Sequence, residues 1–246
     1  MTFTISLAGI SIEIHSLYND VYELCRDYLT GQNPDFCVAV TQADIDFERE
    51  KSASEAKHEG RPVVDFSNGY LETLAVYRKI AEKMLEYDAF LMHGAVVALD
   101  GKAYLFTAPS GLGKTTHTRF WLQKYPEAFI LNGDKPLLRM VQGQFFACGT
   151  PWAGKEGQNK NAMLPLHAVC ALFRGKENRI DRIPFDKVFP LVIGQTYRPS
   201  NAAEMKKTLE LIGDMGKCTR FYTMACNLDP EAARVAKEGM NQDESN

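Results

Sequence analysis

The chain has 246 residues and a formal net charge of −3 at pH 7, with 45% hydrophobic and 24% charged residues. This composition is typical of a folded globular protein, and no nucleic-acid partner is expected because binding to a phosphate backbone requires a basic surface. No apolar run approaches the roughly 20 residues that span a bilayer, and the N-terminus lacks the basic start of a signal peptide, so we expect a cytoplasmic protein without a membrane partner.

The first part of the chain has the pattern of a small α+β region. Residues 3–7 and 10–14 alternate apolar and polar around Ala8-Gly9, which predicts a β-hairpin with one buried face. The following pattern predicts a helix over 17–29 capped by Gly31, a strand over 36–43 and a loop or exposed element over 48–61. Apolar residues at helical spacing predict a long amphipathic helix over 70–87. We expect residues 1–88 to be an integral part of the fold, packed on the remainder.

The cysteines and histidines give no metal motif. Six cysteines are scattered without a C-x-x-C pair, which argues against a zinc knuckle or a redox motif, and buried free thiols are expected. Because the five histidines are equally dispersed, we expect no metal cluster built from side chains alone.

A glycine-rich segment follows the next two predicted strands. Residues 90–99 are an apolar strand, and Asp100-Gly101 is a hairpin turn into a strand over 102–107. The segment Ala108-Pro109-Ser110-Gly111-Leu112-Gly113-Lys114-Thr115 then leads into a predicted helix over 115–124. A strand, a glycine-rich loop and a helix in this order are the context of a Walker A loop, or P-loop.

The residue types of this segment fit a phosphate cradle. Backbone N–H groups of Ser110, Gly111, Leu112, Gly113 and Thr116, together with the positive end of the helix dipole, are expected to surround the phosphates of ATP. Lys114 is expected to reach the β- and γ-phosphate oxygens, and the Thr115 hydroxyl to hold Mg²⁺. Ala108 replaces the first glycine of the pattern, so its backbone must avoid a conformation that only glycine adopts. The alternative is a glycine-rich turn without a nucleotide.

P-loop enzymes also need a carboxylate near the metal. The apolar run at 128–131 predicts a buried parallel strand, and Asp134 follows it, where open α/β sheets place their ligands. A turn-forming aspartate beside Gly133 is the alternative. Residues 137–141 and 144–148 then predict a hairpin about Gln142-Gly143, and no Asn-Lys-x-Asp motif is present, so a small GTPase is not expected.

Taken together, these residues resemble a known family. His93-Gly94 on a strand, the glycine-rich segment, Gly133-Asp134 and a hairpin, then Arg174-Gly175 and Tyr197-Arg198, resemble the catalytic domain of HPr kinase/phosphorylase and, more distantly, phosphoenolpyruvate carboxykinase. The resemblance covers roughly residues 93–212. It implies an α/β fold of this P-loop type with a mixed sheet, a catalytic core over 89–240 and some homo-oligomer. A disordered tail is expected at 241–246.

The resemblance also implies roles for single residues. His93 would lie beside the acidic residue at the phosphates, and Asp134 would be a metal ligand or general base; HPr kinase carries two adjacent aspartates there, whereas this chain has Asp134-Lys135. Lys155 is either a mobile cation on the γ-phosphate or an ordinary surface lysine. Arg174 and Arg198 are either anion binders or surface residues. Trp152 either covers the nucleotide or belongs to the core.

The leading hypothesis is an ATP- and Mg²⁺-dependent kinase that acts on a hydroxyl group, for example a serine of a protein or peptide, with Asp134, His93 and Lys114 as the catalytic residues. A nucleotide-sensing protein with weak or no catalysis is the alternative from another class, and a small-molecule kinase differs only in its acceptor.

Overall fold

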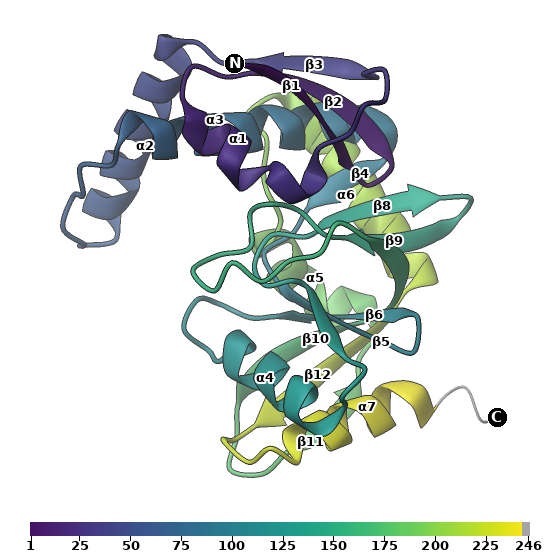
Figure 1. The fold of residues 1–246 in the computed structure, drawn as a ribbon. Coiled ribbons are helices and arrows are strands. Elements are labelled where there is room, and N and C mark those ends of the chain that lie inside the picture. The colour runs from purple at the N-terminus through teal and green to yellow at the C-terminus, as the bar shows by residue number, and fades with distance from the viewer. Residues whose placement is uncertain (243–246) are drawn as a thin grey trace. The chain divides into compact units, whose positions relative to one another are not determined.

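The structure is a computed structural model that describes residues 1–242, and it divides into two compact units, Met1–Lys83 and the remainder of the chain (Figure 1). None of the described helices is both long and apolar enough to cross a membrane. Of the tail that the sequence predicts to be disordered, Asn241 is the last residue of a helix, and residues 243–246 lie outside the described part.

The first unit contains a three-stranded sheet with the order β1-β2-β3. Its strands are β1 (Thr2–Leu7), β2 (Ile10–His15) and β3 (Phe36–Ala39). The predicted hairpin is confirmed, because β1 and β2 pair antiparallel and the turn residues Ala8 and Gly9 have φ of 53° and 77°. β3 pairs parallel to β2 and lies at an edge of the sheet.

The first unit also contains three α-helices and a 3-10 helix. They are α1 (Asn19–Leu24), η1 (Arg26–Tyr28), α2 (Gln42–His58) and α3 (Asn68–Lys83). The long amphipathic helix is confirmed as α3, and it continues into a 3-10 turn, η2 (Met84–Tyr87). In Figure 1, α1 and α3 lie on one face of the small sheet. That face carries its apolar residues, such as Ile12, Ile14 and Val38, which are buried.

Two predictions for this unit are wrong in their boundaries. The predicted helix over 17–29 breaks at Cys25 and is not capped by Gly31, because Leu29 bridges to Ile5 and leaves the helix. The predicted strand over 36–43 stops at Ala39, because a capping box formed by Thr41 and Asp44 starts α2. The polar segment at 48–61, predicted as a loop or an exposed element, is mostly the exposed second part of α2.

The second unit is built on a nine-stranded mixed sheet. The strands are β4 (Ala89–Leu91), β5 (Ala95–Leu99), β6 (Lys102–Thr107), β7 (Phe129–Asn132), β8 (Leu137–Val141), β9 (Gln144–Cys148), β10 (Met163–Arg174), β11 (Arg179–Arg182) and β12 (Arg220–Cys226). Seven of them follow the order β4-β8-β9-β10-β6-β5-β7, and β12 pairs with both β10 and β11. The first part of β10 pairs with β9 and the second with β6, so this long strand joins the two parts of the sheet.

Helices cover both faces of this sheet. They are α4 (Lys114–Lys124), α5 (Phe185–Gly194), α6 (Ala202–Cys218) and α7 (Ala232–Asn241). Val192 of α5 and Met215 of α6 pack in one core cluster, whereas Trp121 of α4 and Met240 of α7 pack in another. Neighbouring residues of β5, such as Val96 and Val97, alternate between the two clusters. The central strands are continuously apolar because both of their faces are buried.

Several predictions for the second unit are confirmed and two are wrong. The turns at Asp100-Gly101 and Gln142-Gly143 have positive φ at both residues and connect β5–β6 and β8–β9 as predicted, and the predicted helix is α4. The predicted strand over 90–99 is divided into β4 and β5, because His93 N donates to Gln195 O and the chain changes partner. The predicted parallel strand is β7, which pairs antiparallel to β5 at an edge of the sheet.

Candidate functional site

The sheet topology brings three loops of the second unit together at one end of the strands, which we call the loop edge of the sheet. β5 runs antiparallel to both β6 and β7, so its start lies beside the ends of these two strands. The segment before β5 contains His93, the glycine-rich loop (residues 108–113) follows β6, and Asp134 follows β7. β10 runs parallel to β6 with Ala171 beside Thr107, so Arg174 reaches the same edge. Hydrogen bonds tie the loops together, since Thr107 Oγ1 donates to His93 O and Gly94 N donates to Asp134 O.

The glycine-rich loop has the backbone conformation of a turn that needs glycine. Gly111 and Gly113 have φ of 79° and 92°, and an added Cβ at either position would meet open space. Glycine is therefore favoured at these two positions because of the positive φ and not because a side chain lacks space. Ala108 is fully buried and does not have a positive φ, so alanine is tolerated where the P-loop pattern starts with glycine. Gly113 is the N-cap residue of α4, which directs the positive end of this helix toward the loop.

Lys114 folds back over the loop that precedes it. Its side chain is buried, and Nζ donates to Ala108 O at 2.8 Å. Burial lowers the pKa of Lys114 below 10.5; Asp134 acts to raise it and Lys135 to lower it. Thr115 is exposed and Thr116 half-buried at the start of the same helix, and Ser110 is exposed in the loop.

Both carboxylate oxygens of Asp134 contact a side-chain nitrogen atom. His93 Nε2 lies 3.0 Å from Oδ1, and Lys135 Nζ lies 3.1 Å from Oδ2. Burial acts to raise the pKa of Asp134, but the hydrogen bond from His93 and the charge of Lys135 outweigh it, and the pKa lies below 3.8. Asp134 is therefore ionised at neutral pH, and the site contains a fixed negative charge beside two lysines.

A buried asparagine shapes the turn that carries Asp134. Asn132 Oδ1 accepts from the backbone N–H groups of Asp134 and Lys135, at 2.9 and 2.6 Å. Its Nδ2 donates to the carbonyl and hydroxyl oxygens of Thr150, both at 3.0 Å. Asn132, Thr150 and Lys135 are not among the site residues predicted from the sequence. An asparagine at the end of a strand before Gly-Asp is a turn signal, but its link to Thr150 depends on the tertiary structure.

A cavity of about 490 Å³ lies beside the glycine-rich loop. Its wall includes Leu112, Thr116, His117, Phe120, Arg174 and Leu228. His117 is buried, and burial lowers its pKa to about 4, so the imidazole is neutral at pH 7. Trp121 Nε1–H donates to His117 Nε2 at 3.2 Å, which leaves the proton of the neutral ring on Nδ1. Within the described residues, Nδ1 is buried without a hydrogen-bond partner.

The remaining candidate residues lie at different distances from this edge. Lys155 is exposed in the loop after β9 and follows Gly154, whose backbone lies against the Asp134 side chain. The neighbouring Glu156 accepts from Arg119 of α4 at 2.8 Å. Trp152 is 9% exposed and belongs to the buried part of the same loop. Arg198 is exposed and further away, because the pairing of Thr196 with Met92 directs it along β4 and away from His93.

No family model matches the chain, and no curated protein sequence matches it. Among solved structures, the chain is similar to the HPr(Ser) kinase/phosphatase from Coxiella burnetii, with a TM-score of 0.40 and 9% sequence identity. The similarity covers 63% of this chain and 98% of that chain. This is a distant likeness to a kinase-like fold.

Proposed function

We propose that the chain is an ATP- and Mg²⁺-dependent phosphotransferase that transfers the γ-phosphate to a hydroxyl group. One observation carries this proposal: the sheet brings the buried Lys114 of the strand–loop–helix turn and the ionised Asp134 to the same end of its strands. Transfer of a phosphoryl group requires mainly positioning and charge compensation, which a cation and a metal-binding carboxylate supply.

The glycine-rich loop fits the triphosphate. Its backbone N–H groups and the N-terminus of α4 would surround the β-phosphate, as in other anion sites at helix N-termini. Lys114 would exchange its hydrogen bond to Ala108 O for one to a β- or γ-phosphate oxygen. Mg²⁺ would be held by the Thr115 hydroxyl and by Asp134, and it would supply charge neutralisation between the β- and γ-phosphates when bound.

The cavity beside the loop fits the nucleoside. Its volume lies in the range of small-molecule sites, and Leu112, Phe120 and Leu228 give it an apolar wall that suits a base. His117 forms part of the same wall, and its neutral ring would pack against the base or ribose. Arg174 lines the same cavity and would contact phosphate oxygens.

The lowered pKa of Asp134 favours a role in metal binding over a role as general base. A metal ligand must be deprotonated, whereas a general base works best when its pKa is near the operating pH. The ionised carboxylate also orients His93 through its 3.0 Å contact, so His93 is the second candidate to accept the proton of the attacking hydroxyl.

A nucleotide-binding regulatory protein is the second candidate function. It is favoured by Lys135, whose ammonium group already neutralises the Asp134 oxygen that a metal ion would use. If Lys135 stays in place when ATP binds, Mg²⁺ binding weakens and transfer is slow, while the loop still holds the phosphates. For the acceptor, we propose a serine of a protein or peptide, and a small-molecule hydroxyl is the alternative.

The test is transfer of labelled phosphate from γ-labelled ATP to serine peptides and to small hydroxyl compounds, combined with thermal unfolding. We expect Mg-ATP to raise the melting temperature of the wild type and of Lys206→Ala, an exposed control on α6. Lys114→Ala should lose both this stabilisation and transfer, because the γ-phosphate charge is then uncompensated. Unchanged stabilisation of Lys114→Ala by Mg-ATP would exclude the loop as the site. Stabilisation without transfer to either kind of acceptor would favour the regulatory function.

A further inference from the structure

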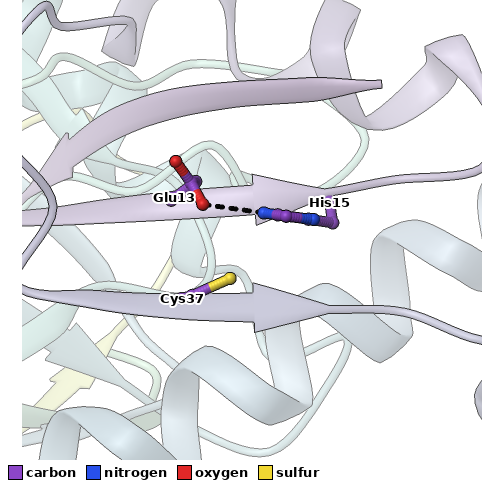
Figure 2. Close-up of side chains that lie close together, drawn as sticks. All are labelled: Glu13, His15 and Cys37. Atoms are coloured by element: carbon purple, nitrogen blue, oxygen red, sulfur yellow. Dashed lines mark hydrogen bonds and ion pairs between the residues drawn. The ribbon is translucent and has the colours of Figure 1, made fainter.

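The outer face of the small sheet carries a cluster of three potential metal ligands. Figure 2 shows Glu13, His15 and Cys37 side by side on β2 and β3. Glu13 and His15 are two residues apart on β2, so both side chains point to the same face of the sheet. Cys37 lies directly opposite Glu13 on β3. Their chain neighbours Ile14 and Val38 point to the opposite face of the sheet and are buried.

The donor atoms of this cluster are close enough to share one ion. One oxygen of Glu13, one ring nitrogen of His15 and the sulfur of Cys37 all lie within 4.8 Å of one another. In a tetrahedral zinc site with bonds of about 2.0 to 2.3 Å, neighbouring ligand atoms are roughly 3.5 Å apart. Glu13 Oε1 and His15 Nε2, now 2.7 Å apart, would separate slightly around an ion. Both side chains are partly exposed, at 34% and 47%, so small rotations meet little resistance.

We propose that Glu13, His15 and Cys37 form a Zn²⁺-binding site with one open coordination position. A thiolate together with an imidazole and a carboxylate suits zinc, whereas Mg²⁺ and Ca²⁺ prefer oxygen ligands alone. Three protein ligands leave the fourth tetrahedral position to water or to a donor atom from another molecule. This site belongs to the first unit and is independent of the proposed phosphotransfer.

Zinc at this position would connect two neighbouring strands of the sheet. β3 has only four residues and lies at the sheet edge, and the ion would bond it to β2 through Cys37. No such cluster is expected from the sequence, because Cys37 lies more than 20 positions from Glu13 and His15 and the three form no sequence motif. Parallel pairing of β2 with β3 brings them together.

The experiment uses the full chain, without an affinity tag, after removal of metals. Co²⁺ titration should show one ion per chain, with a sulfur-to-cobalt charge-transfer band and the strong visible bands of a tetrahedral ion, and Zn²⁺ should displace it. Cys37→Ser should abolish the charge-transfer band. Cys37→Ser and His15→Gln should each lower zinc affinity by at least about 10²-fold, because even the loss of a residue that only hydrogen-bonds to a metal ligand lowers metal affinity by about 10- to 100-fold. Cys218→Ser and His58→Gln replace exposed residues outside the cluster and should bind zinc as the wild type does.

A second measurement needs no variant. Zn²⁺ should protect Cys37 from alkylation in the wild-type chain, with the exposed Cys218 as the internal control whose alkylation does not change. The proposal is overturned if Cys37 is alkylated equally with and without zinc. It is also overturned if bound Co²⁺ lacks the sulfur band or if Cys37→Ser keeps wild-type zinc affinity.

Discussion

At the scale of single residues, the candidate site combines one carboxylate with two lysines. Asp134 contacts His93 and Lys135, and the glycine-rich loop with Lys114 lies at the same end of the strands. In the proposed complex, the triphosphate would bring negative charge and Mg²⁺, so the two lysines would gain phosphate partners and Asp134 would gain the metal ion. Each charged group of the site would then face a partner of opposite charge, and none would be buried unpaired.

The Asp134→Asn variant separates binding from transfer. Asparagine keeps the shape of the side chain but removes its negative charge, so the metal site is weakened and His93 loses the ionised group that orients it. We expect transfer to fall by about 10²-fold or more, whereas nucleotide binding falls less because the loop and Lys114 remain intact. Transfer rates and ATP affinity measured on the same preparation provide the check. A wild-type transfer rate in Asp134→Asn would assign the metal and base roles to other residues.

The cavity beside the loop makes a prediction about the nucleoside. Leu228 is 82% exposed at the cavity rim, and a base bound there would cover it. We expect Leu228→Ala to weaken ATP binding by about 10-fold, the effect of losing one buried leucine side chain, and to leave the binding of inorganic tripolyphosphate unchanged. Leu209→Ala, which truncates a 37% exposed leucine on α6, is the matched control. Equal weakening of both ligands would place the base outside the cavity.

At the scale of elements, a single strand direction creates the site. β5 runs antiparallel to both neighbours, so the residues before it meet the residues after β6 and β7. In an all-parallel sheet, His93 would lie at the opposite edge from the glycine-rich loop. Contacts between elements also explain why the polar helix α2 forms. Thr41 and Asp44 cap its start, and its buried Glu48 accepts a hydrogen bond from Arg78 of α3 at 2.6 Å.

The contacts of α2 predict a pH-dependent stability. Burial acts to raise the pKa of Asp44, but hydrogen bonds from Thr41 and Lys79 and the charge of Lys79 lower it from 3.8 to about 2. Since the folded-state pKa is depressed, the stabilisation is present above the unfolded pKa and is lost as the pH falls through the folded pKa. We expect Asp44→Asn to lower the free energy of unfolding by about 1 to 2 kcal/mol at pH 7.

The difference in the free energy of unfolding between the wild type and Asp44→Asn should shrink as the pH falls from about 4 to about 2, because Asp44 then becomes protonated in the wild type. Urea unfolding at a series of pH values measures it. Asp46→Asn, at an exposed aspartate of the same helix, should show almost no effect at either end of this range. A difference that stays constant down to pH 2 would mean that the Asp44 charge does not stabilise the helix.

At the scale of the whole molecule, the chain consists of two compact units with separate sheets. The glycine-rich loop, Asp134, His93 and the cavity all belong to the second unit, and the proposed zinc ligands all belong to the first. The two proposals therefore concern different units.

This division predicts that a fragment starting at Met84 binds Mg-ATP with the affinity of the full chain, provided that it folds. The reason is that every residue proposed to contact the nucleotide lies in that fragment. Calorimetry on the fragment and the full chain measures the affinities, and circular dichroism checks folding. A folded fragment that does not bind would show that the first unit contributes to the nucleotide site.

The sequence alone determined the features that depend on neighbouring residues. The hairpin turns at Ala8-Gly9, Asp100-Gly101 and Gln142-Gly143 follow from local backbone preferences, as does the loop whose glycines adopt positive φ. Asp134 was placed at the end of a strand by the apolar run before it. These predictions succeeded because turn chemistry and hydrophobic periodicity act over a few residues.

Only the tertiary structure decided which distant residues meet. The antiparallel direction of β7, the division of the strand at His93 and the contact of Asn132 with Thr150 depend on strand pairing between separate segments. The same is true of Cys37 beside Glu13 and of His117 at the cavity. Local preferences do not encode these pairings, because they are chosen by the burial of both faces of the sheet and by the hydrogen bonds of strands that are far apart in the chain.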